Sequence, residues 1–441
     1  MLTSSALLTD RYELTMLQAA RHSGVADRQA VFEVFARSLP AGRRYGVFAG
    51  TGRLLERIRD FKFETDELEF LAANKVVDNA TLDWLANYRF TGNISGYREG
   101  EVYFPHSPVL TVEGTFAEAV VLETVVLSVL NFDTAVASAA ARMTSVAAGR
   151  SLAEMGSRRV SEIAAVAAAR AAYIAGFSAT SNLEAGRSWG VPTMGTAAHA
   201  FTLIHDTEEA AFRAQIETFG TATTLLVDTY NIEAGVRKAI EVAGTELGSV
   251  RIDSGDLAIE VAKVRSLLDS LGAQKTRITV TNDLDEYAIA ALAAVPVDAY
   301  GVGTSVATGS GAPTAGFVYK LVSHQNPGGE WINVAKTSAH KTNLAGRKTA
   351  VRRHDSAGVA TAELVHAQTS AEVAAGVATE PGEFDRDLIV DLVVGGQINQ
   401  QFAGIEGTRN ARTHHASAIS ALPAQALRLT RGEPGIATQL S

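Results

Sequence analysis

The chain has 441 residues, of which 46% are hydrophobic and 20% are charged. Because domains usually run to about 100–200 residues, this length suggests two or three of them. The sequence contains no cysteine, which excludes disulfides, iron–sulfur clusters, thiolate zinc sites and a cysteine nucleophile. Its 39 basic and 48 acidic side chains give a net charge of −9, and this acidic balance argues against a general nucleic-acid-binding protein.

The start of the chain shows no targeting signal. Residues 1–11 carry no basic cluster ahead of an apolar stretch, so we expect no signal peptide. Charged side chains interrupt the alanine-rich runs at Arg142, Glu162 and Arg170, and we therefore expect no membrane-spanning helix. The sequence predicts a cytoplasmic protein that binds neither nucleic acid nor membrane.

Residues 1–125 and 311–441 share the pattern of antiparallel strands. Apolar and polar residues alternate over residues 30–37 and 93–114, and a strong hairpin turn at 326–329 separates two further strand candidates. The candidates in the second region are residues 317–323, 331–336 and 349–353. We expect the two ends of the chain to form one α+β domain, with a hinge to the rest at residues 308–316.

Residues 126–310 alternate between short β-branched segments and helical stretches at intervals of roughly 25–30 residues, which is typical of βαβ units. The strand candidates are residues 191–196, 224–230, 249–254, 277–281 and 297–302. Apolar strands separated by helices indicate a parallel sheet covered by helices. So many units in a short stretch favour an irregular TIM-like α/β barrel, and we expect the catalytic domain here.

Ligand-like side chains follow these strands one after another. In α/β barrels such groups gather at the carboxyl ends of the strands. The candidates in chain order are Arg158, Arg159, His199, Asp228, Arg251, Asp253, Asn282, Asp283, Gly303 and Thr304. Guanidinium groups bind carboxylate or phosphate, carboxylates bind Mg²⁺, and a glycine-rich turn offers backbone N–H groups to phosphate. Together they indicate a site for a phosphorylated sugar and a metal.

Each candidate also has a simpler interpretation. In this interpretation Arg158 and Arg159 are a solvated pair and His199 is a core histidine with its hydrogen bonds satisfied. Asp228 then caps the helix that begins near Asn231, a position where aspartate is favoured. The segment RIDSGD at residues 251–256 is harder to explain in this way. It places two ionic side chains on one face of an apolar strand, where burial without partners is costly.

Ten segments, taken together in order and spacing, resemble the nicotinate phosphoribosyltransferase family over nearly the whole chain. They include LTDRY (8–12), FEVF (32–35), EGE (99–101), GSRR (156–159), GTAAH (195–199), LVDTY (226–230), RIDSGD (251–256) and GVGT (301–304). The resemblance implies transfer of phosphoribose from phosphoribosyl pyrophosphate to nicotinate, giving nicotinate mononucleotide and pyrophosphate in NAD salvage. It further implies coupling to ATP, as in an ATP-dependent ligase, a need for Mg²⁺, and a homodimer with shared active sites.

The resemblance also assigns roles to individual residues. His199 matches a histidine that ATP phosphorylates, with Asp228 beside it or, together with Asp253, on Mg²⁺. Arg158 and Ser181 match groups on the pyridine ring, on which Tyr12 of the other subunit stacks. Ribose and phosphate would be bound by Arg251, Asp253, Asn282, Asp283, Gly303 and Thr304. Met155 and Ala200 depart from the residues usual in the family.

Two other functions stay open at this point. A nicotinamide phosphoribosyltransferase would differ only in its substrate, but relatives that recognise the amide carry an acidic residue where this chain has Ser181. A barrel that binds a nucleotide or sugar phosphate without turnover is the second alternative. The presence of His199, Arg251 and Asp253 favours the enzyme that acts on nicotinate.

Overall fold

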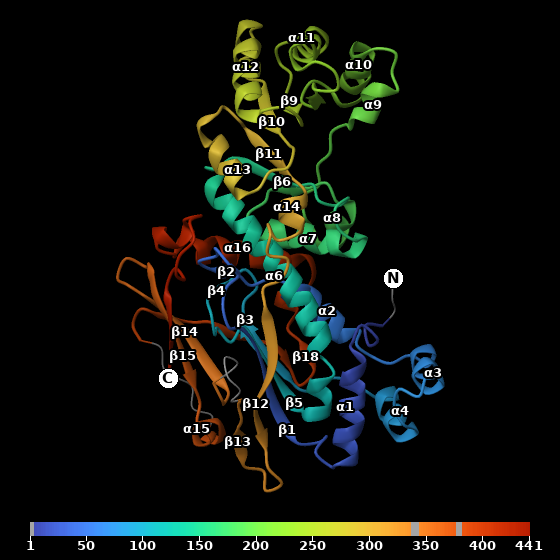
Figure 1. Ribbon diagram of the computed structural model, residues 1–441, viewed down its shortest axis with the longest axis vertical. Coiled ribbons are helices and arrows are strands. Elements are labelled where there is room, and N and C mark those ends of the chain that lie inside the picture. Colours follow the sequence, from blue (N-terminus) through green and yellow to red (C-terminus); the bar gives the residue numbers. More distant parts are fainter. Residues whose placement is uncertain (1–3, 337–343, 376–381) are drawn as a thin grey trace. The chain divides into compact units, whose positions relative to one another are not determined.

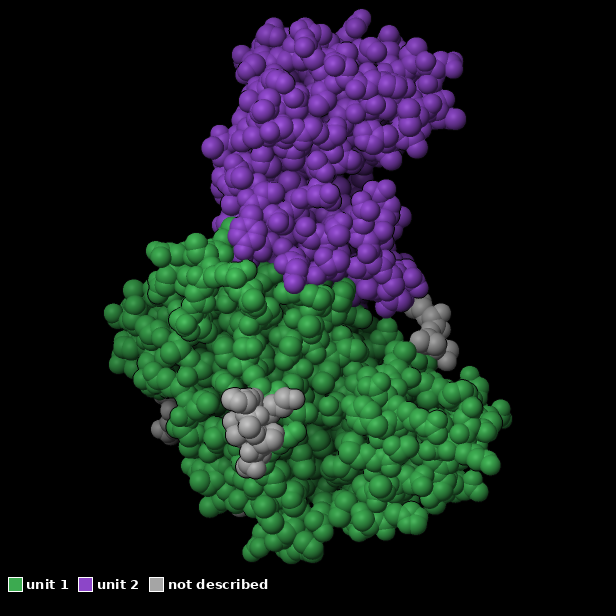
Figure 2. Space-filling model, viewed as in Figure 1, with its two compact units in different colours: residues 1–138, 312–441 green, residues 139–311 purple. Residues whose placement is uncertain are grey.

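A computed structural model describes residues 4–336, 344–375 and 382–441. The chain divides into two compact units, shown in Figure 2. Unit 1 comprises residues 1–138 and 312–441, and unit 2 comprises residues 139–311. The sequence placed the corresponding boundaries at 125/126 and 310/311, whereas the first boundary between the units falls inside the long helix α6 (Glu123–Val146).

Unit 1 contains a seven-stranded sheet in the order β13-β12-β1-β5-β3-β17-β18, and all its neighbouring strands are antiparallel. A four-stranded sheet has the order β16-β14-β15-β19, and β2 pairs with β4. The strands are β1 (Gln29–Ala36), β2 (Gly46–Val47), β3 (Asn93–Tyr97), β4 (Val102–Tyr103), β5 (Leu110–Thr115), β12 (Phe317–Gln325), β13 (Trp331–Asn333), β14 (Lys348–His354), β15 (Ala360–Ala367), β16 (Asp385–Asp387), β17 (Ile389–Val394), β18 (Gln397–Ile398) and β19 (Ala437–Leu440).

The strands from the two ends of the chain meet in the core of unit 1. Strand β1 pairs with β12, and Phe32 of β1 stacks on Tyr319 of β12 with ring centroids 4.8 Å apart. The turn expected at residues 326–329 closes the β12–β13 hairpin, where the Asn326 side chain accepts hydrogen bonds from the backbone of Gly328 and Glu330. The antiparallel strands expected at both chain ends are therefore confirmed.

Seven helices or parts of helices accompany these sheets within the described residues of unit 1. They are α1 (Arg11–His22), α2 (Thr51–Arg59), α3 (Thr65–Ala73), α4 (Asn79–Ala86), α5 (Phe116–Val120), α15 (Ser370–Ala375) and α16 (Gly404–Ser420). Helix α6 begins in this unit.

Unit 2 contains a six-stranded parallel sheet in the order β7-β6-β11-β10-β9-β8. Strands β6, β11, β10 and β9 follow one another in this order in Figure 1. Its strands are β6 (Ser151–Glu154), β7 (Ala179–Thr180), β8 (Thr224–Leu226), β9 (Ser249–Ile252), β10 (Arg277–Val280) and β11 (Ala299–Val302). The helices are α7 (Glu162–Ile174), α8 (Leu183–Trp189), α9 (His199–Leu203), α10 (Glu208–Phe219), α11 (Ile232–Ala243), α12 (Leu257–Ser270), α13 (Glu286–Ala291) and α14 (Thr304–Ala307). The expected α/β unit with a parallel sheet is thus observed.

Two finer expectations for this sheet differ from the structure. Residues 191–196 form no strand, because only Thr193 pairs, in an isolated bridge to Thr180. Pro192 lacks the N–H group that a continuing ladder needs, although its carbonyl accepts a hydrogen bond from Thr180. Throughout unit 2, whose residues are all described, β7 and β8 are edge strands without a ladder between them, so a closed barrel is not confirmed.

Several helices of unit 2 begin where a side chain accepts a hydrogen bond from the first turn. Thr207, Asn231, Asp256 and Asp285 each accept a hydrogen bond from the first turn of α10, α11, α12 and α13, respectively. The cap of α11 is therefore Asn231, and the alternative interpretation of Asp228 as a helix cap is wrong.

One helical stretch, Phe116–Val146, is long and apolar enough to cross a membrane by length and composition alone. This corrects the expectation that no apolar run reaches that length. However, 67% of its most apolar window is buried inside the protein, as in the core helix of a globular fold. Arg142 within it is also buried, and its guanidinium lies 3.0 Å from the carboxylate of Glu286.

Candidate active site

The candidate side chains of unit 2 follow the carboxyl ends of adjacent parallel strands. Asp228 comes two residues after β8, Arg251 lies in β9 with Asp253 just beyond it, and Asn282 follows β10 by two residues. Because parallel strands end at the same edge of a sheet, their following loops share that edge. The open sheet therefore gathers these side chains at one edge, as we expected a closed barrel to do.

His199, the first residue of α9, lies beside two of these carboxylates. Its Nε2 is 3.8 Å from Asp228 Oδ1 and also 3.8 Å from Asp253 Oδ2. Its Nδ1 is within hydrogen-bonding distance, 3.1 Å, of the Thr229 hydroxyl. The imidazole side chain is 40% exposed, so a reagent can reach the ring while both carboxylates stay close to Nε2.

Asp228 is buried and its two oxygens differ. Oδ2 accepts hydrogen bonds of 2.7 Å from the backbone N–H of Asp253 and from the Ser254 hydroxyl. Among the described residues no donor reaches Oδ1, the oxygen that points to His199. A buried carboxylate oxygen without a donor is costly, and a cation or a metal ion at this position would stabilise it.

Arg251 connects the histidine loop to the strand that follows β9. Its Nε donates to Thr281 Oγ1 and its Nη1 to Thr196 Oγ1, each at 3.1 Å. Its Nη2 lies 3.6 Å from Asp253 Oδ2, and the Thr281 hydroxyl in turn donates to Asp253. Arg251 thus holds residue 196, three residues before His199, and faces Asp253.

The structure brings His199, Asp228, Arg251 and Asp253 into one contact network. The sequence analysis missed the hydroxyls of Thr229 and Thr281 that complete it. The signal for Thr229 was its position directly after Asp228. Thr281 gave no such signal, because its contact with Arg251 arises from the pairing of β9 with β10.

Arg158 and Ser181 follow the other end of the sheet, after β6 and β7. Both are exposed. Among the described residues Arg158 has no ion pair, which leaves its guanidinium available to an anion. The loops that carry these residues are joined by a 3.0 Å hydrogen bond from the Asn182 amide to the Ser157 hydroxyl.

The four remaining candidates of unit 2 follow β10 and β11. Asn282 has φ of 112°, which is uncommon for a residue with a side chain. Its side-chain oxygen accepts a 2.8 Å hydrogen bond from the N–H of Asp283. Gly303 precedes Thr304, the first residue of α14. No contact recorded for these four residues joins them to His199, and their role towards phosphate stays a prediction.

Tyr12 belongs to unit 1, in α1, and its side chain is exposed. Burial of the hydroxyl and the neighbouring Glu13 raise the pKa of Tyr12 to about 12. The ring is therefore neutral at physiological pH. Its expected stacking in the other subunit's site stays a prediction.

The carboxylates fit a magnesium site that the substrate completes. Among the described residues, no group of three or more histidine and acidic side chains converges as a ready-made metal cage. Asp228 Oδ1 and Asp253 Oδ2 nevertheless both face His199 Nε2. Mg²⁺ usually takes one or two protein carboxylates and completes its shell with water and substrate phosphates.

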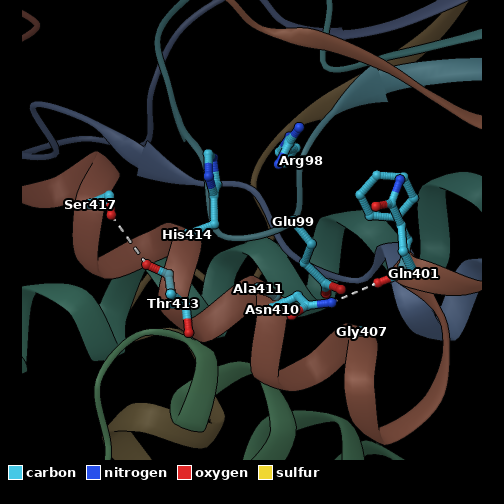
Figure 3. Close-up of a pocket in the computed structure, with 10 residues that line it drawn as sticks. Arg98, Glu99, Gln401, Gly407, Asn410, Ala411, Thr413, His414 and Ser417 are labelled. Carbon is cyan, nitrogen blue, oxygen red and sulfur yellow. Dashed lines mark hydrogen bonds between the residues drawn. The ribbon is translucent and has the colours of Figure 1, made fainter.

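A separate hollow of about 400 Å³ lies in unit 1, between α16 and the turn at residues 98–100 (Figure 3). Arg98, Asn410 and His414 line it, and the Asn410 amide donates to the carbonyl of Gln401. Glu99 of the EGE segment lines it, but none of the candidate site residues chosen from the sequence does. We therefore keep the candidate active site in unit 2.

Comparisons with known proteins show the family to which the chain belongs. The family model described as the nicotinate phosphoribosyltransferase (NAPRTase) N-terminal domain matches residues 7–131, and the NAPRTase family model matches residues 150–369. The nicotinate phosphoribosyltransferase pncB1 of Mycobacterium tuberculosis is 54% identical over 99% of this chain and 95% of its own length. A nicotinate phosphoribosyltransferase of Bacillus subtilis is 37% identical over 79% of this chain and 73% of its own length.

The fold is shared with solved structures as well. The crystal structure of human nicotinic acid phosphoribosyltransferase matches with a TM-score of 0.80 at 24% identity, covering 98% of this chain and 97% of the human chain. At 24% identity this structural match supports the fold alone. The family assignment is supported by the sequence matches given above. The chain belongs to the nicotinate phosphoribosyltransferase family.

Proposed function

We propose that this protein transfers a phosphoribosyl group from phosphoribosyl pyrophosphate to nicotinate, and that ATP drives the reaction by phosphorylating His199. The observation that supports this most directly is the exposed imidazole of His199 with two carboxylates, Asp228 and Asp253, each 3.8 Å from Nε2. The family membership supplies the reaction, and the imidazole supplies a nucleophile for ATP. We include a cytoplasmic homodimer with shared sites in this proposal.

The phosphorylation step uses the two sides of the imidazole differently. Nδ1–H donates to Thr229 Oγ1, which leaves the lone pair of Nε2 for the γ-phosphorus of ATP. The new N–P bond forms as the bond from that phosphorus to the bridging oxygen breaks, and ADP leaves with the electron pair. Asp228 and Asp253 stabilise the positive charge that develops on the ring.

The transfer step needs positioning more than proton transfer. The pyridine nitrogen of nicotinate is itself the nucleophile, and it attacks C1 of the ribose as pyrophosphate leaves with the electrons of the broken C–O bond. Arg158 and Ser181 bind the ring, and Arg251, Asn282, Asp283, Gly303 and Thr304 bind the sugar and its phosphate. Holding the reactants in line supplies much of the rate. Mg²⁺, held by Asp228 and Asp253, would neutralise charge on the phosphates.

Labelling with ATP that carries ³²P at the γ-phosphate tests the proposal. We expect acid-labile, base-stable label on the wild-type protein, none on His199→Ala, and normal labelling of His205→Ala. His205 is a matched control because it lies two residues beyond α9 and its Nδ1 contacts the carbonyl of Phe201. Label that persists in His199→Ala would refute the phosphohistidine.

A steady-state assay with nicotinate, nicotinamide and quinolinate, with and without ATP, tests the overall reaction. We expect turnover with nicotinate and faster turnover with ATP. Preference for nicotinamide would support the amide-specific alternative. Binding of phosphoribosyl pyrophosphate without turnover of any of the three compounds would support the non-catalytic one.

A further inference from the structure

Glu154 is a buried acid at the ring-binding end of the sheet to which neither the sequence analysis nor the proposed mechanism gives a role. It is the last residue of β6, and its exposed fraction is 0%. Strand β6 lies between β7 and β11, so Glu154 pairs with Thr180 on one side and Val302 on the other. Its side chain therefore lies where the loops with Arg158 and Ser181 both begin.

Each oxygen of the Glu154 carboxylate binds a different loop. Oε1 accepts a hydrogen bond from the N–H of Gly156, in the loop that leads to Arg158. Oε2 accepts one of 2.6 Å from the Thr180 hydroxyl, directly before Ser181. The backbone carbonyl of Glu154 also accepts a 2.9 Å hydrogen bond from the N–H of Ser181.

Both hydrogen bonds are donated to Glu154, which accepts one on each oxygen. Thr180 Oγ1 accepts a 3.0 Å hydrogen bond from the N–H of Asn182 and gives its own proton to Glu154. Gly156 offers a backbone N–H, which can only donate. A carboxylate satisfies both donors, whereas the amide of a glutamine presents one acceptor and one donor.

The Gly156 loop is packed too closely to find another position cheaply. A side-chain carbon at Gly156 would lie 2.6 Å from the Ala307 side chain and 2.7 Å from Glu154 Oε1. It would also lie 3.0 Å from the carbonyl oxygen of Gly303. Gly156 is thus packed between the Glu154 carboxylate and the segment after β11.

An acid in this position has an electrostatic cost. Burial raises the pKa of Glu154, and the hydrogen bonds from Thr180 and Gly156 lower it only in part. A buried acid is expected where its oxygens accept hydrogen bonds that hold other parts of the protein in place. Here the ordered groups are the loops that carry Arg158 and Ser181.

We propose that Glu154 is a positioning residue that fixes Arg158 relative to Ser181 and thereby sets the affinity for the carboxylate of the pyridine substrate. This inference rests on the proposed function, because it takes nicotinate as the ligand of Arg158. Glu154 itself does not contact the substrate. Its contribution is the separation and orientation of the two loops.

Glu154→Gln is the principal test, because it keeps the shape of the side chain and removes one acceptor. We expect the KM for nicotinate to rise about five- to tenfold, as for the loss of one well-placed hydrogen bond. The KM for phosphoribosyl pyrophosphate and kcat should stay within about twofold of wild type. Glu162→Gln, the same change at the exposed first residue of α7, should leave all three values unchanged.

Substitutions at Thr180 test the same hydrogen bond without changing Glu154 itself. Thr180→Val removes the hydroxyl and should raise the KM for nicotinate as Glu154→Gln does, whereas Thr180→Ser keeps the hydroxyl and should behave as wild type. Because both changes break the same hydrogen bond, the double variant Glu154→Gln/Thr180→Val should be no more than about twofold worse than either single variant. Fully multiplicative effects would contradict the shared contact.

Calorimetric titration with nicotinate separates this inference from the proposed function. If wild-type protein binds nicotinate without turnover and Glu154→Gln raises the Kd about five- to tenfold, the inference holds and the proposed function fails. A Kd in Glu154→Gln within twofold of wild type overturns the inference alone. So does an equal rise in the KM values of both substrates, which would indicate general damage to the fold. Absence of nicotinate binding by the wild-type protein overturns both.

Discussion

Replacing Asp228 with asparagine tests whether the buried carboxylate assists phosphorylation of His199. Asp228 Oδ2 accepts hydrogen bonds from the Asp253 backbone and the Ser254 hydroxyl. The amide oxygen of an asparagine can accept both. The substitution therefore removes the negative charge beside His199 and keeps the shape and the contacts of the side chain.

The expected magnitude follows from the separation of the two groups. Asp228 Oδ1 lies 3.8 Å from His199 Nε2. Two unit charges at this distance interact by about 4 kcal/mol at an effective dielectric constant of about 20. Because the His199 side chain is 40% exposed, solvent screening should reduce this interaction to about 1–2 kcal/mol. We therefore expect Asp228→Asn to lower the rate of phosphorylation about tenfold.

The assay is the initial rate of label transfer from ATP carrying ³²P at the γ-phosphate to the protein. Ser254→Ala is the control, because it removes one hydrogen bond to Asp228 without changing any charge. We expect its rate to stay within about threefold of wild type. A wild-type rate in Asp228→Asn, with an unchanged melting temperature, would refute the electrostatic role of Asp228.

Three further predictions test the ring end of the site, the buried acid of α1 and the shared dimer site. Arg158→Ala should raise the KM for nicotinate more than the KM for phosphoribosyl pyrophosphate, and equal increases in steady-state assays would contradict the assignment. Burial raises the pKa of Glu13 from 4.5 to about 7, so its contribution to stability is present below pH 4.5 and lost as the pH rises through 7. Glu13→Gln should then raise the free energy of unfolding at pH 8 by about 3 kcal/mol and change it little at pH 4.5, and equal melting-temperature shifts at both pH values would rule this out. Tyr12→Ala and His199→Ala subunits should regain activity when mixed, and inactive heterodimers of proven composition would count against shared sites.

Much of the unit 2 fold was predictable because its strands and helix starts carry local signals. The cap residues Asn231, Asp256 and Asp285 mark the beginnings of three helices in the sequence itself. Strand β7 was missed because a segment of two residues is too short to show a period. Strand β6 was missed because its sequence, SLAE, contains no β-branched or aromatic residue. Residues 191–196 gave a false strand because their apolar character outweighed the proline in the pattern. Closure of the sheet depends on pairing between distant strands, which no local pattern encodes.

The charged residues of the site were predictable for a related reason. Asp228 and Asp253 follow apolar strands and Arg251 lies near the end of one, and parallel strands bring their carboxyl ends to one edge. Their hydroxyl partners depend on the register between strands, as for Thr281, which reaches Arg251 across the β9–β10 pair. Register is a property of the folded sheet, and sequence analysis of one strand cannot supply it.

The two buried carboxylates of this sheet differ in a way that separates their roles. Both oxygens of Glu154 accept a hydrogen bond from a neighbouring loop, so we expect this acid to act through the loops it joins. Asp228 has two donors on Oδ2 and, among the residues described, none on Oδ1. An acceptor left without a donor in a protein interior costs about 1–3 kcal/mol. We expect such an acceptor where a group from outside the carboxylate's own hydrogen bonds is stabilised by it. In the mechanism that we propose, that group is the His199 imidazole when it becomes cationic, or the metal ion that arrives with the phosphates, because Oδ1 faces His199.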